Sequence, residues 1–420
     1  MRKTFKDYFV VLFGTAFSRG LSFLSSVLVA RFLGPENFGK FSIFFLVSVI
    51  TWYLPMAFDT SYVRFAKTSN STAEKNAFLR SSIFLKLIYG ALVILLSYPL
   101  AIFLARYAFQ KPEIKWLLVL ALVSGVFQSF LMSIASIFQE KEKFTFFSFL
   151  YSFYSGLILV ILLLLVAFHW RLTLFSVVLA YFFSSFCVGL FSLFALFIKK
   201  FKGFLTVQKE FLVKSFELSK WAFGTNVLTS VFPRLDAMFL ARFVEFGLLG
   251  IYSAGQQIIM IISVMTGSVS NTFLPKACKA VESNGAFRKF RKESLFLAGL
   301  INAALLVLII TSPWFIRLLY GPSYQLAIRI TQILLLGWFF HIFYIPFAGL
   351  FFALDEADKR FYLEVFKYLV AIPLLLILVP RFKIIGAAVA LSATLIINTI
   401  VALAVLWVSL RRKIKIYNSN

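Results

Sequence analysis

Three charged side chains stand in the middle of stretches that are otherwise apolar, namely Arg19, Arg234 and Asp236. A charge in the hydrocarbon core of a bilayer costs at least about 2.5–3.5 kcal/mol on insertion scales, so an ionisable residue inside an apolar span indicates a functional site. Guanidinium groups keep their charge and can bind a phosphate through two hydrogen bonds at once. The two arginines therefore predict a site for an anionic group such as a phosphate or a diphosphate.

Asp59 and Arg64 stand near one end of the second apolar stretch. We expect Arg64 to join the other two arginines in binding the anion. The two aspartates are candidates for ion coupling. Alternatively they form buried ion pairs, Asp236 with Arg19 and Asp59 with Arg64, that hold helices together. Three arginines against two carboxylates leave an excess of positive charge, which favours the anionic ligand.

Pro233 precedes Arg234 directly and lies inside the same apolar stretch. A proline within a span kinks the helix and frees a backbone carbonyl. Arg234 and Asp236 are two positions apart, which places them about 200° apart around a helix, so they do not neutralise each other simply. We expect Arg234 to face the site and Asp236 to make a packing or interhelical contact.

Polar and aromatic side chains in the second half could contact sugars. Asn226, Tyr252 and Gln256 lie in or near apolar stretches. The same residue types also join helices inside membranes, so both interpretations stay open. The sequence contains no Gly-rich phosphate loop, no Cys or His cluster and no nucleophile with a partner. We therefore expect no catalytic residue, no metal and no cofactor, and a protein that is not an enzyme.

The composition requires a bilayer as solvent. Of 420 residues, 61% are hydrophobic and 14% are charged, 55 are Phe, and the mean hydropathy is +0.92. A water-soluble core could not hide so much apolar surface. We predict an all-α integral membrane protein with twelve transmembrane helices, at residues 8–30, 41–58, 83–104, 116–138, 144–168, 172–198, 221–240, 248–273, 295–316, 328–354, 362–379 and 384–410.

The net charge of +25 indicates the orientation of the chain. With twelve spans and a cytoplasmic amino terminus, the inner loops and the two termini hold well over twice as many Lys and Arg as the outer loops. Cytoplasmic loops carry such an excess. We therefore predict a multi-pass protein of the cytoplasmic membrane with both termini cytoplasmic.

The chain contains an internal repeat. The motifs FGT at 13–15, ARF at 30–32 and FGKFS at 38–42 recur as FGT, ARF and LGIYS about 210 residues further on. Each half holds an even number of predicted spans, so both enter the membrane from the same side. We predict two parallel six-helix lobes, residues 1–198 and 221–420, around a central cavity. Residues 199–220, where aromatic and aliphatic residues alternate with lysines, are predicted to be a cytoplasmic amphipathic linker.

The string ARFLGPENFG at residues 30–39 resembles the beginning of the Wzx-type flippases of polysaccharide biosynthesis. Asp236 with LGIYSA at 249–254, and LYGPSY at 319–324, are similar to later segments of that family. The resemblance implies membership of the superfamily that also contains the multidrug and toxin extruders (the MATE-like transporters) and the lipid II flippases. It further implies two six-helix lobes and alternating access.

The substrate class implied by this resemblance is an undecaprenyl-diphosphate-linked oligosaccharide, moved from the inner to the outer leaflet for cell-surface polysaccharide synthesis. Arg19, Arg64 and Arg234 would receive the diphosphate. Membrane lipids and the proteins of glycan synthesis and polymerisation are the expected partners, and nucleic acid is not. A cation-coupled multidrug extruder of the same fold is one alternative, although its cavity should be apolar or acidic. A membrane glycan polymerase or ligase is the other, although it should need larger outer loops with acidic residues.

Overall fold

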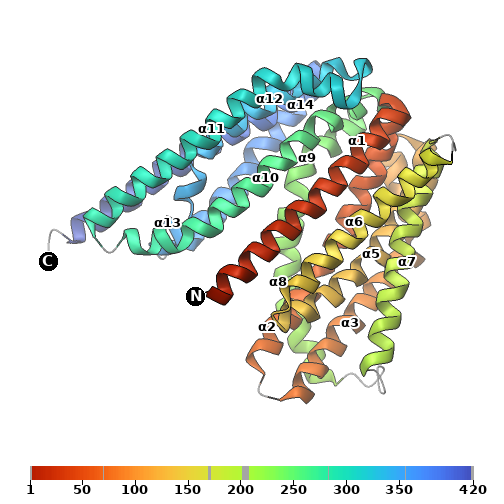
Figure 1. Ribbon diagram of the computed structural model, residues 1–420, viewed down its shortest axis with the longest axis horizontal. Coiled ribbons are helices and arrows are strands. Elements are labelled where there is room, and N and C mark those ends of the chain that lie inside the picture. Colours follow the sequence, from red (N-terminus) through yellow and green to blue (C-terminus); the bar gives the residue numbers. More distant parts are fainter. Residues whose placement is uncertain are drawn as a thin grey trace. The chain divides into compact units, whose positions relative to one another are not determined.

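The computed structural model describes residues 2–69, 71–168, 172–200, 208–281, 283–354 and 356–417. Within these ranges every regular element is a helix (Figure 1). The helices up to the middle of the chain are α1 (Arg2–Tyr53), α2 (Met56–Thr68), α3 (Thr72–Leu95), α4 (Ser97–Phe103), η1 (Leu104–Ala108), η2 (Pro112–Ile114), α5 (Lys115–Glu140), α6 (Phe144–Ala167), α7 (Leu174–Lys200), α8 (Lys209–Val231), η3 (Phe232–Arg234) and α9 (Leu235–Phe243). They are followed by α10 (Phe246–Ala280), α11 (Asn284–Tyr320), η4 (Pro322–Tyr324), α12 (Gln325–Ile342), η5 (Ile345–Phe347), α13 (Leu350–Ala353) and α14 (Ala357–Tyr417).

Two Gly-Pro pairs mark where apolar helices change direction. Gly34 has φ 71° and ψ 171° inside α1, and Gly321 has φ 88° and ψ −179° between α11 and η4. Only glycine adopts this region without strain. The proline that follows each one has a fixed φ that suits the first turn of the next helix. The two motifs that carry the family resemblance, GPEN and GPSY, are therefore helix breaks of the same construction.

Eight segments of the described residues are long and apolar enough to cross a membrane. One of them, Val10–Thr68, contains 59 residues. A straight helix of that length would extend roughly 90 Å, about three times the hydrocarbon core. Gly34 divides the segment into two parts, which correspond to the predicted spans 8–30 and 41–58. Each of the twelve predicted spans lies on one to three of the helices, while the count of twelve crossings stays a prediction.

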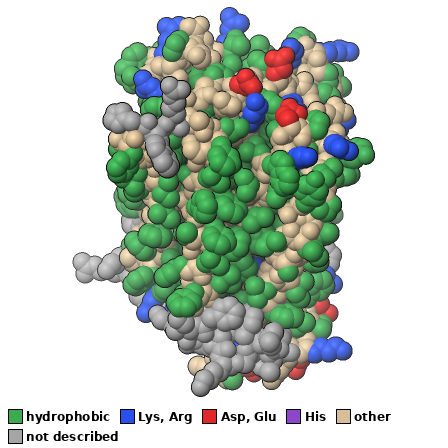
Figure 2. All heavy atoms as spheres, turned by 90° about the vertical axis from the view of Figure 1, so that its right-hand side faces the viewer, with side chains coloured by type: hydrophobic (Ala, Val, Ile, Leu, Met, Phe, Trp, Pro, Cys, Tyr) green, Lys and Arg blue, Asp and Glu red, His purple; other side chains and the backbone are tan. Residues whose placement is uncertain are grey.

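The surface agrees with a membrane protein. Hydrophobic side chains cover the middle of the face drawn in Figure 2, and charged side chains gather toward its two ends. In the most apolar 18-residue stretch of α6, only 17% is buried inside the protein. Most residues of this helix are nevertheless apolar. Such an exposed apolar helix is stable only against lipid.

The chain forms two compact units, residues 1–242 and residues 243–420. In the first unit α1 packs against α5 and α6, and α5 packs against α7 (Figure 1). In the second unit α12 packs against α10, α11 and α14. The first unit includes α8 and most of α9, which the repeat assigns to the second lobe. The boundary between the predicted lobes, 1–198 and 221–420, was taken from the internal repeat and differs from the boundary between the two compact units. The two lobes stay a prediction.

The second part of the predicted linker belongs to α8 and packs against protein. Phe211 contacts the ring of Phe78 on α3 with centroids 4.9 Å apart. Ser61 on α2 donates a hydrogen bond to the Ser215 carbonyl at 3.2 Å. Residues 201–207 of the predicted linker lie outside the described residues. The apolar side of the segment from Lys209 onward is therefore at least partly covered by α2 and α3.

The break inside α14 places a lysine in a strained conformation. Lys383 has φ 50° and ψ −128°, a region that favours glycine, at the end of the predicted outer loop 380–383. We expect Lys383→Gly to raise the free energy of unfolding by about 1 kcal/mol, because the backbone is then no longer strained. The measurement is thermal unfolding in detergent, with Lys383→Ala as the variant that keeps the strain. A Lys383→Gly protein less stable than Lys383→Ala would contradict the expectation.

Candidate functional site

Arg234 is positioned by an interruption of its helix. Helix α8 ends at Val231, Phe232–Arg234 form a single 3-10 turn with Pro233 at its start, and α9 begins at Leu235. The predicted proline kink is confirmed. Its cause is local, since the proline has no N–H to donate to the preceding turn. Arg234 is half-buried at this break, where the helix axis is free to change direction.

Arg19 is positioned by the packing of its neighbour. Ser18 is buried and lies against α6, where its hydroxyl contacts the Tyr151 carbonyl and the Ser155 hydroxyl, each at 3.0 Å. Ser22, one turn later, donates to the Ser155 hydroxyl at 3.0 Å. Successive residues of a helix are about 100° apart, so Arg19 projects away from this interface. It is exposed.

The two arginines lie near each other in the first unit. Arg234 is within electrostatic range of Arg19, of Tyr53 and of Asp236. Asn226 on α8 donates from Nδ2 to the Tyr53 carbonyl at 3.4 Å, which ties α8 to the end of α1. Of the residues predicted for the site, Arg19 and Asp236 thus lie within electrostatic range of Arg234, while Asn226 contacts the backbone of Tyr53. We call Arg19 and Arg234 the paired-arginine site.

A second guanidinium group and one carboxylate lie within electrostatic range of Arg234 among the described residues of this site. Asp236 is completely buried and accepts a hydrogen bond from the Ala237 N–H at 2.8 Å, in the first turn of α9. A carboxylate is stabilised at a helix N-terminus by the helix dipole. The carboxylate of Asp236 thus contributes to the start of α9 as well as to the electrostatics around Arg234. A bound anion would relieve the mutual repulsion of the two guanidinium groups and could accept hydrogen bonds from both.

Arg64 is not brought to this pair by any contact among the described residues. It lies on α2 and is exposed, and its carbonyl accepts a hydrogen bond from Thr68. We expect Arg64→Ala to lower transport less than about threefold, because no contact among the described residues places its guanidinium group at the paired-arginine site. The measurement is the initial rate of transport in proteoliposomes. A loss as large as that of Arg234→Ala would place Arg64 in the site after all.

The other two residues predicted to contact sugars lie on α10 in the second unit. Tyr252 is fully buried, so its ring is part of the core and cannot contact a sugar in this conformation. Gln256 is half-buried one turn later. The sequence left open whether Tyr252 contacts a sugar or packs between helices, and its burial agrees with packing.

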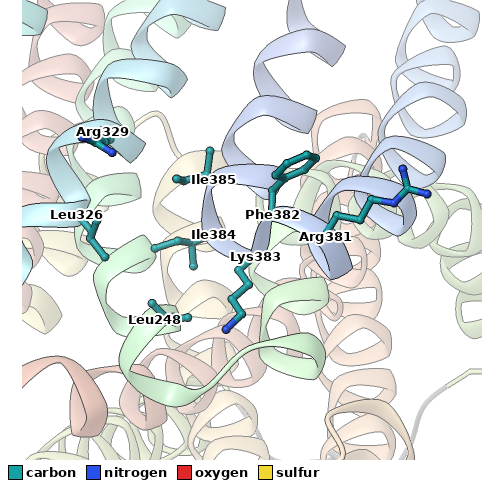
Figure 3. Close-up of a pocket in the computed structure, with 8 residues that line it drawn as sticks. All are labelled: Leu248, Leu326, Arg329, Arg381, Phe382, Lys383, Ile384 and Ile385. Atoms are coloured by element: carbon teal, nitrogen blue, oxygen red, sulfur yellow. The ribbon is translucent and has the colours of Figure 1, made fainter.

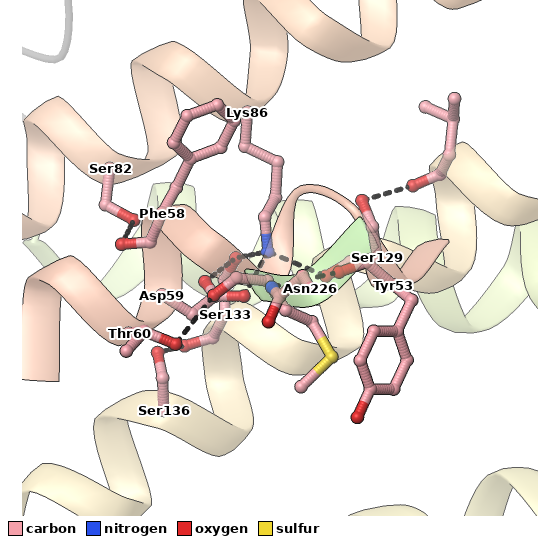
Figure 4. Close-up of polar contacts among 12 residues, drawn as sticks. Tyr53, Phe58, Asp59, Thr60, Ser82, Lys86, Ser129, Ser133, Ser136 and Asn226 are labelled. Atoms are coloured by element: carbon pink, nitrogen blue, oxygen red, sulfur yellow. Dashed lines mark hydrogen bonds and ion pairs between the residues drawn. The ribbon is translucent and has the colours of Figure 1, made fainter. Parts of the chain in front are cut away.

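Asp59 forms an ion pair with Lys86, not with Arg64 (Figure 4). Lys86 Nζ lies 2.5 Å from Asp59 Oδ2, and the two side chains are 0% and 8% exposed. Ser133 on α5 donates to Asp59 Oδ1 at 3.1 Å and accepts from Lys86 at 2.9 Å. The ion pair therefore joins α2, α3 and α5. The alternative in which Asp59 pairs with Arg64 is not the arrangement observed, because residues five positions apart are about 140° apart around a helix.

Lys86 was not among the residues predicted for the site, although it is a charged residue inside a predicted apolar span. It is the fourth residue of the predicted span 83–104, so it lies near the end of the span and not in the middle, where Arg19 and Arg234 were selected. A criterion extended to the whole length of each span would have included Lys86. Its pairing with Asp59 could not be predicted in the same way. It depends on which faces of α2 and α3 meet.

The second unit has a depression of about 250 Å³, lined by Leu248, Leu326, Arg329 and residues 381–385. None of the residues predicted for the site lines it. The charged ends of Arg329, Arg381 and Lys383 point in three different directions (Figure 3). These cations do not converge on one ligand, in contrast to the paired-arginine site, and the depression is not our candidate for the functional site.

The sequence of residues 4–281 matches the family profile described as polysaccharide biosynthesis protein. This match covers more than half of the chain. The chain belongs to the polysaccharide biosynthesis protein family. The resemblance stated from the first loop and the LGIYSA segment is thereby confirmed, and both motifs lie within the matched residues.

Individual relatives agree with this family assignment. The chain is 23% identical over 228 residues to the probable flippase AglR of Haloferax volcanii, an alignment that covers 53% of this chain and 47% of AglR. The chain thus spans about half the length of this curated relative. The family is described as that of polysaccharide biosynthesis proteins, this relative is named a probable flippase, and this protein is a multi-pass membrane protein.

Solved structures show the fold. The lipid II flippase MurJ in an inward closed conformation superposes with a TM-score of 0.77 at 19% identity, covering 98% of this chain and 93% of MurJ. An inward-facing multidrug resistance MATE family transporter of the MOP superfamily gives 0.73 at 15% identity, covering 94% and 96%. The all-helical transporter fold predicted from the sequence is therefore confirmed.

Proposed function

We propose that this protein is a flippase that moves an undecaprenyl-diphosphate-linked oligosaccharide repeat unit from the inner to the outer leaflet of the cytoplasmic membrane, for cell-surface polysaccharide synthesis. The observation that carries the proposal is the paired-arginine site, where Arg234 and Arg19 lie in electrostatic range of each other within a membrane-embedded unit. A diphosphate has the charge and the oxygen geometry that two guanidinium groups bind.

The proposed cycle requires no covalent chemistry and no cofactor. The diphosphate and the sugars cross while bound to the protein, and the lipid tail stays in the bilayer. Two conformations expose the site to opposite sides of the membrane in turn, and the populations of the two states are shifted by the ligand's different affinity for each. Both termini lie in the cytoplasm, where the proteins that synthesise the glycan would deliver the substrate.

Family membership and the names of the relatives support this substrate class. The family is that of polysaccharide biosynthesis proteins, AglR is a probable flippase, and MurJ is a lipid II flippase. Lipid-linked glycan substrates therefore fit the family better than the cationic drugs of a multidrug extruder. The excess of positive charge at the paired-arginine site points the same way, because it would repel a cationic drug.

The experiment that tests the proposal is transport by purified protein in liposomes. A labelled undecaprenyl-diphosphate-linked oligosaccharide is placed in one leaflet, and its appearance in the other is followed with a membrane-impermeable reagent that acts on the sugar. We expect protein-dependent movement of the diphosphate-linked substrate. A cationic dye in the same liposomes tests the multidrug extruder, and an increase in glycan length tests the polymerase. Movement of the dye alone, or glycan elongation, would overturn the proposal.

A further inference from the structure

The buried ammonium group of Lys86 has a complete set of oxygen partners. Nζ donates to Asp59 Oδ2 at 2.5 Å, to the Ser129 carbonyl at 2.9 Å and to the Ser133 hydroxyl at 2.9 Å. A lysine ammonium has three donors, and all three are used here (Figure 4). The Lys86 side chain is completely buried, so solvent does not share in this coordination.

These partners are the kinds of ligand that hold a free metal cation in a membrane protein. A carboxylate, a backbone carbonyl and a hydroxyl coordinate hard monovalent cations such as Na⁺. The ligands are also held in place independently of Lys86. Ser133 donates to Asp59 Oδ1 at 3.1 Å, and the carbonyl of Ser129 belongs to the regular helix α5. The oxygen arrangement is therefore a built site and not a chance contact of a long side chain.

The site lies next to the break between α1 and α2, where three helices meet. Asp59 is in the first turn of α2, directly after the break between Tyr53 and Met56 that ends α1. Lys86 comes from α3, and Ser129 and Ser133 come from α5. A cation held here neutralises Asp59 and joins α2, α3 and α5. The preceding helix α1 ends at Tyr53, which lies within electrostatic range of Arg234.

We propose that the ammonium group of Lys86 is a permanently attached cation in an oxygen-lined cation site formed by Asp59, Ser129 and Ser133, and that the site binds a free monovalent cation once the lysine side chain is removed. In the native protein the cation cannot dissociate. A free sodium or potassium ion therefore does not occupy this site in the native protein, and a gradient of these ions does not act on transport through it. The proposal does not depend on the transported substrate.

The test is chemical rescue of Lys86→Ala. Removal of the side chain beyond Cβ leaves a space that matches n-propylammonium. Thermal unfolding of the purified variant is measured in NaCl, in n-propylammonium chloride and in choline chloride at equal ionic strength, choline being too large for the site. The matched control is Lys86→Ala combined with Asp59→Asn, in which the carboxylate that attracts the cation is absent.

We expect the melting temperature of Lys86→Ala to rise saturably by roughly 3 °C in sodium or n-propylammonium relative to choline, as binding to the folded state alone requires. The double variant and the parent protein should show no such difference. An equal response in choline, or a response that persists in the double variant, would overturn the proposal.

Whether Lys86→Ala folds, and in which salt, also tests the proposal. If it can be purified only when sodium or n-propylammonium is present throughout, the proposal is supported. If it does not fold in any of these salts while Lys86→Met combined with Asp59→Asn does, no free cation reaches the carboxylate and the proposal is wrong. If neither variant folds, the lysine itself is required rather than a cation, which is equally a refutation.

Discussion

Arg234→Ala is expected to lower transport of the diphosphate-linked substrate by about 10- to 100-fold, and Arg19→Ala by a similar factor. Each substitution removes charge-assisted hydrogen bonds to phosphate, which contribute about 1.5–3 kcal/mol each. The protein should still fold, since Arg19 is exposed and Arg234 is only half-buried. The measurement is the initial rate of transport in proteoliposomes, together with size-exclusion chromatography to show that the variants are monodisperse.

The lysine variants separate charge from geometry at the same positions. Arg234→Lys and Arg19→Lys keep the positive charge but lose the planar fork that binds two phosphate oxygens, so we expect intermediate rates. Arg64→Ala is the control for the loss of an arginine outside the pair. Normal transport by both alanine variants would remove the paired-arginine site from the mechanism, even if the protein proves to be a flippase.

Gly125→Leu is expected to abolish production of folded protein. A Cβ at Gly125 would lie 2.6 Å from the Ser48 carbonyl oxygen and 2.6 Å from Thr51 Cβ. These atoms belong to α1, so α5 and α1 approach each other too closely for any side chain at this position. Small residues allow such contacts in membrane helices. Even Gly125→Ala should cost about 1–3 kcal/mol, because the interface would be overpacked.

The control for Gly125 is another helical glycine of the same unit. A Cβ at Gly20, on α1, would have no neighbouring atom within 4 Å. Gly20→Ala should therefore be neutral or raise the free energy of unfolding by up to about 1 kcal/mol, through its better helix propensity. Fluorescence-detected size exclusion after heating compares the two positions in one series. Equal stability of Gly125→Ala and Gly20→Ala would show that the α1–α5 contact is not close in the folded protein.

Several features of the fold could be predicted because they depend on neighbours in the chain. Apolar length predicts helices that cross a bilayer, and each predicted span lies on a helix. Pro233 predicts the break before Arg234, since the missing N–H acts within one helical turn. The Gly-Pro pair at Gly34 predicts a turn for the same kind of local reason.

The two arginines of the paired-arginine site were selected from the sequence, and their role in binding a substrate stays a prediction. Arg19 and Arg234 were selected by the energetic cost of a charge within an apolar span, and the structure places them near each other. The selection included Arg64 as well, which no described contact joins to the pair. The cost of burial indicates that a charge needs a partner, but it does not identify that partner.

The sequence by itself determined that this chain is an all-helical membrane protein of the polysaccharide biosynthesis family and that deeply placed arginines are its candidate functional groups. These conclusions rest on composition, on motifs and on interactions within a few residues. Only the tertiary structure decided that Asp59 pairs with Lys86, that Tyr252 belongs to the core and that α8 packs with the first unit. The physical reason is that apolar helices in lipid have many faces of similar hydrophobicity, so the faces that meet are selected by close packing and by polar pairing between distant segments.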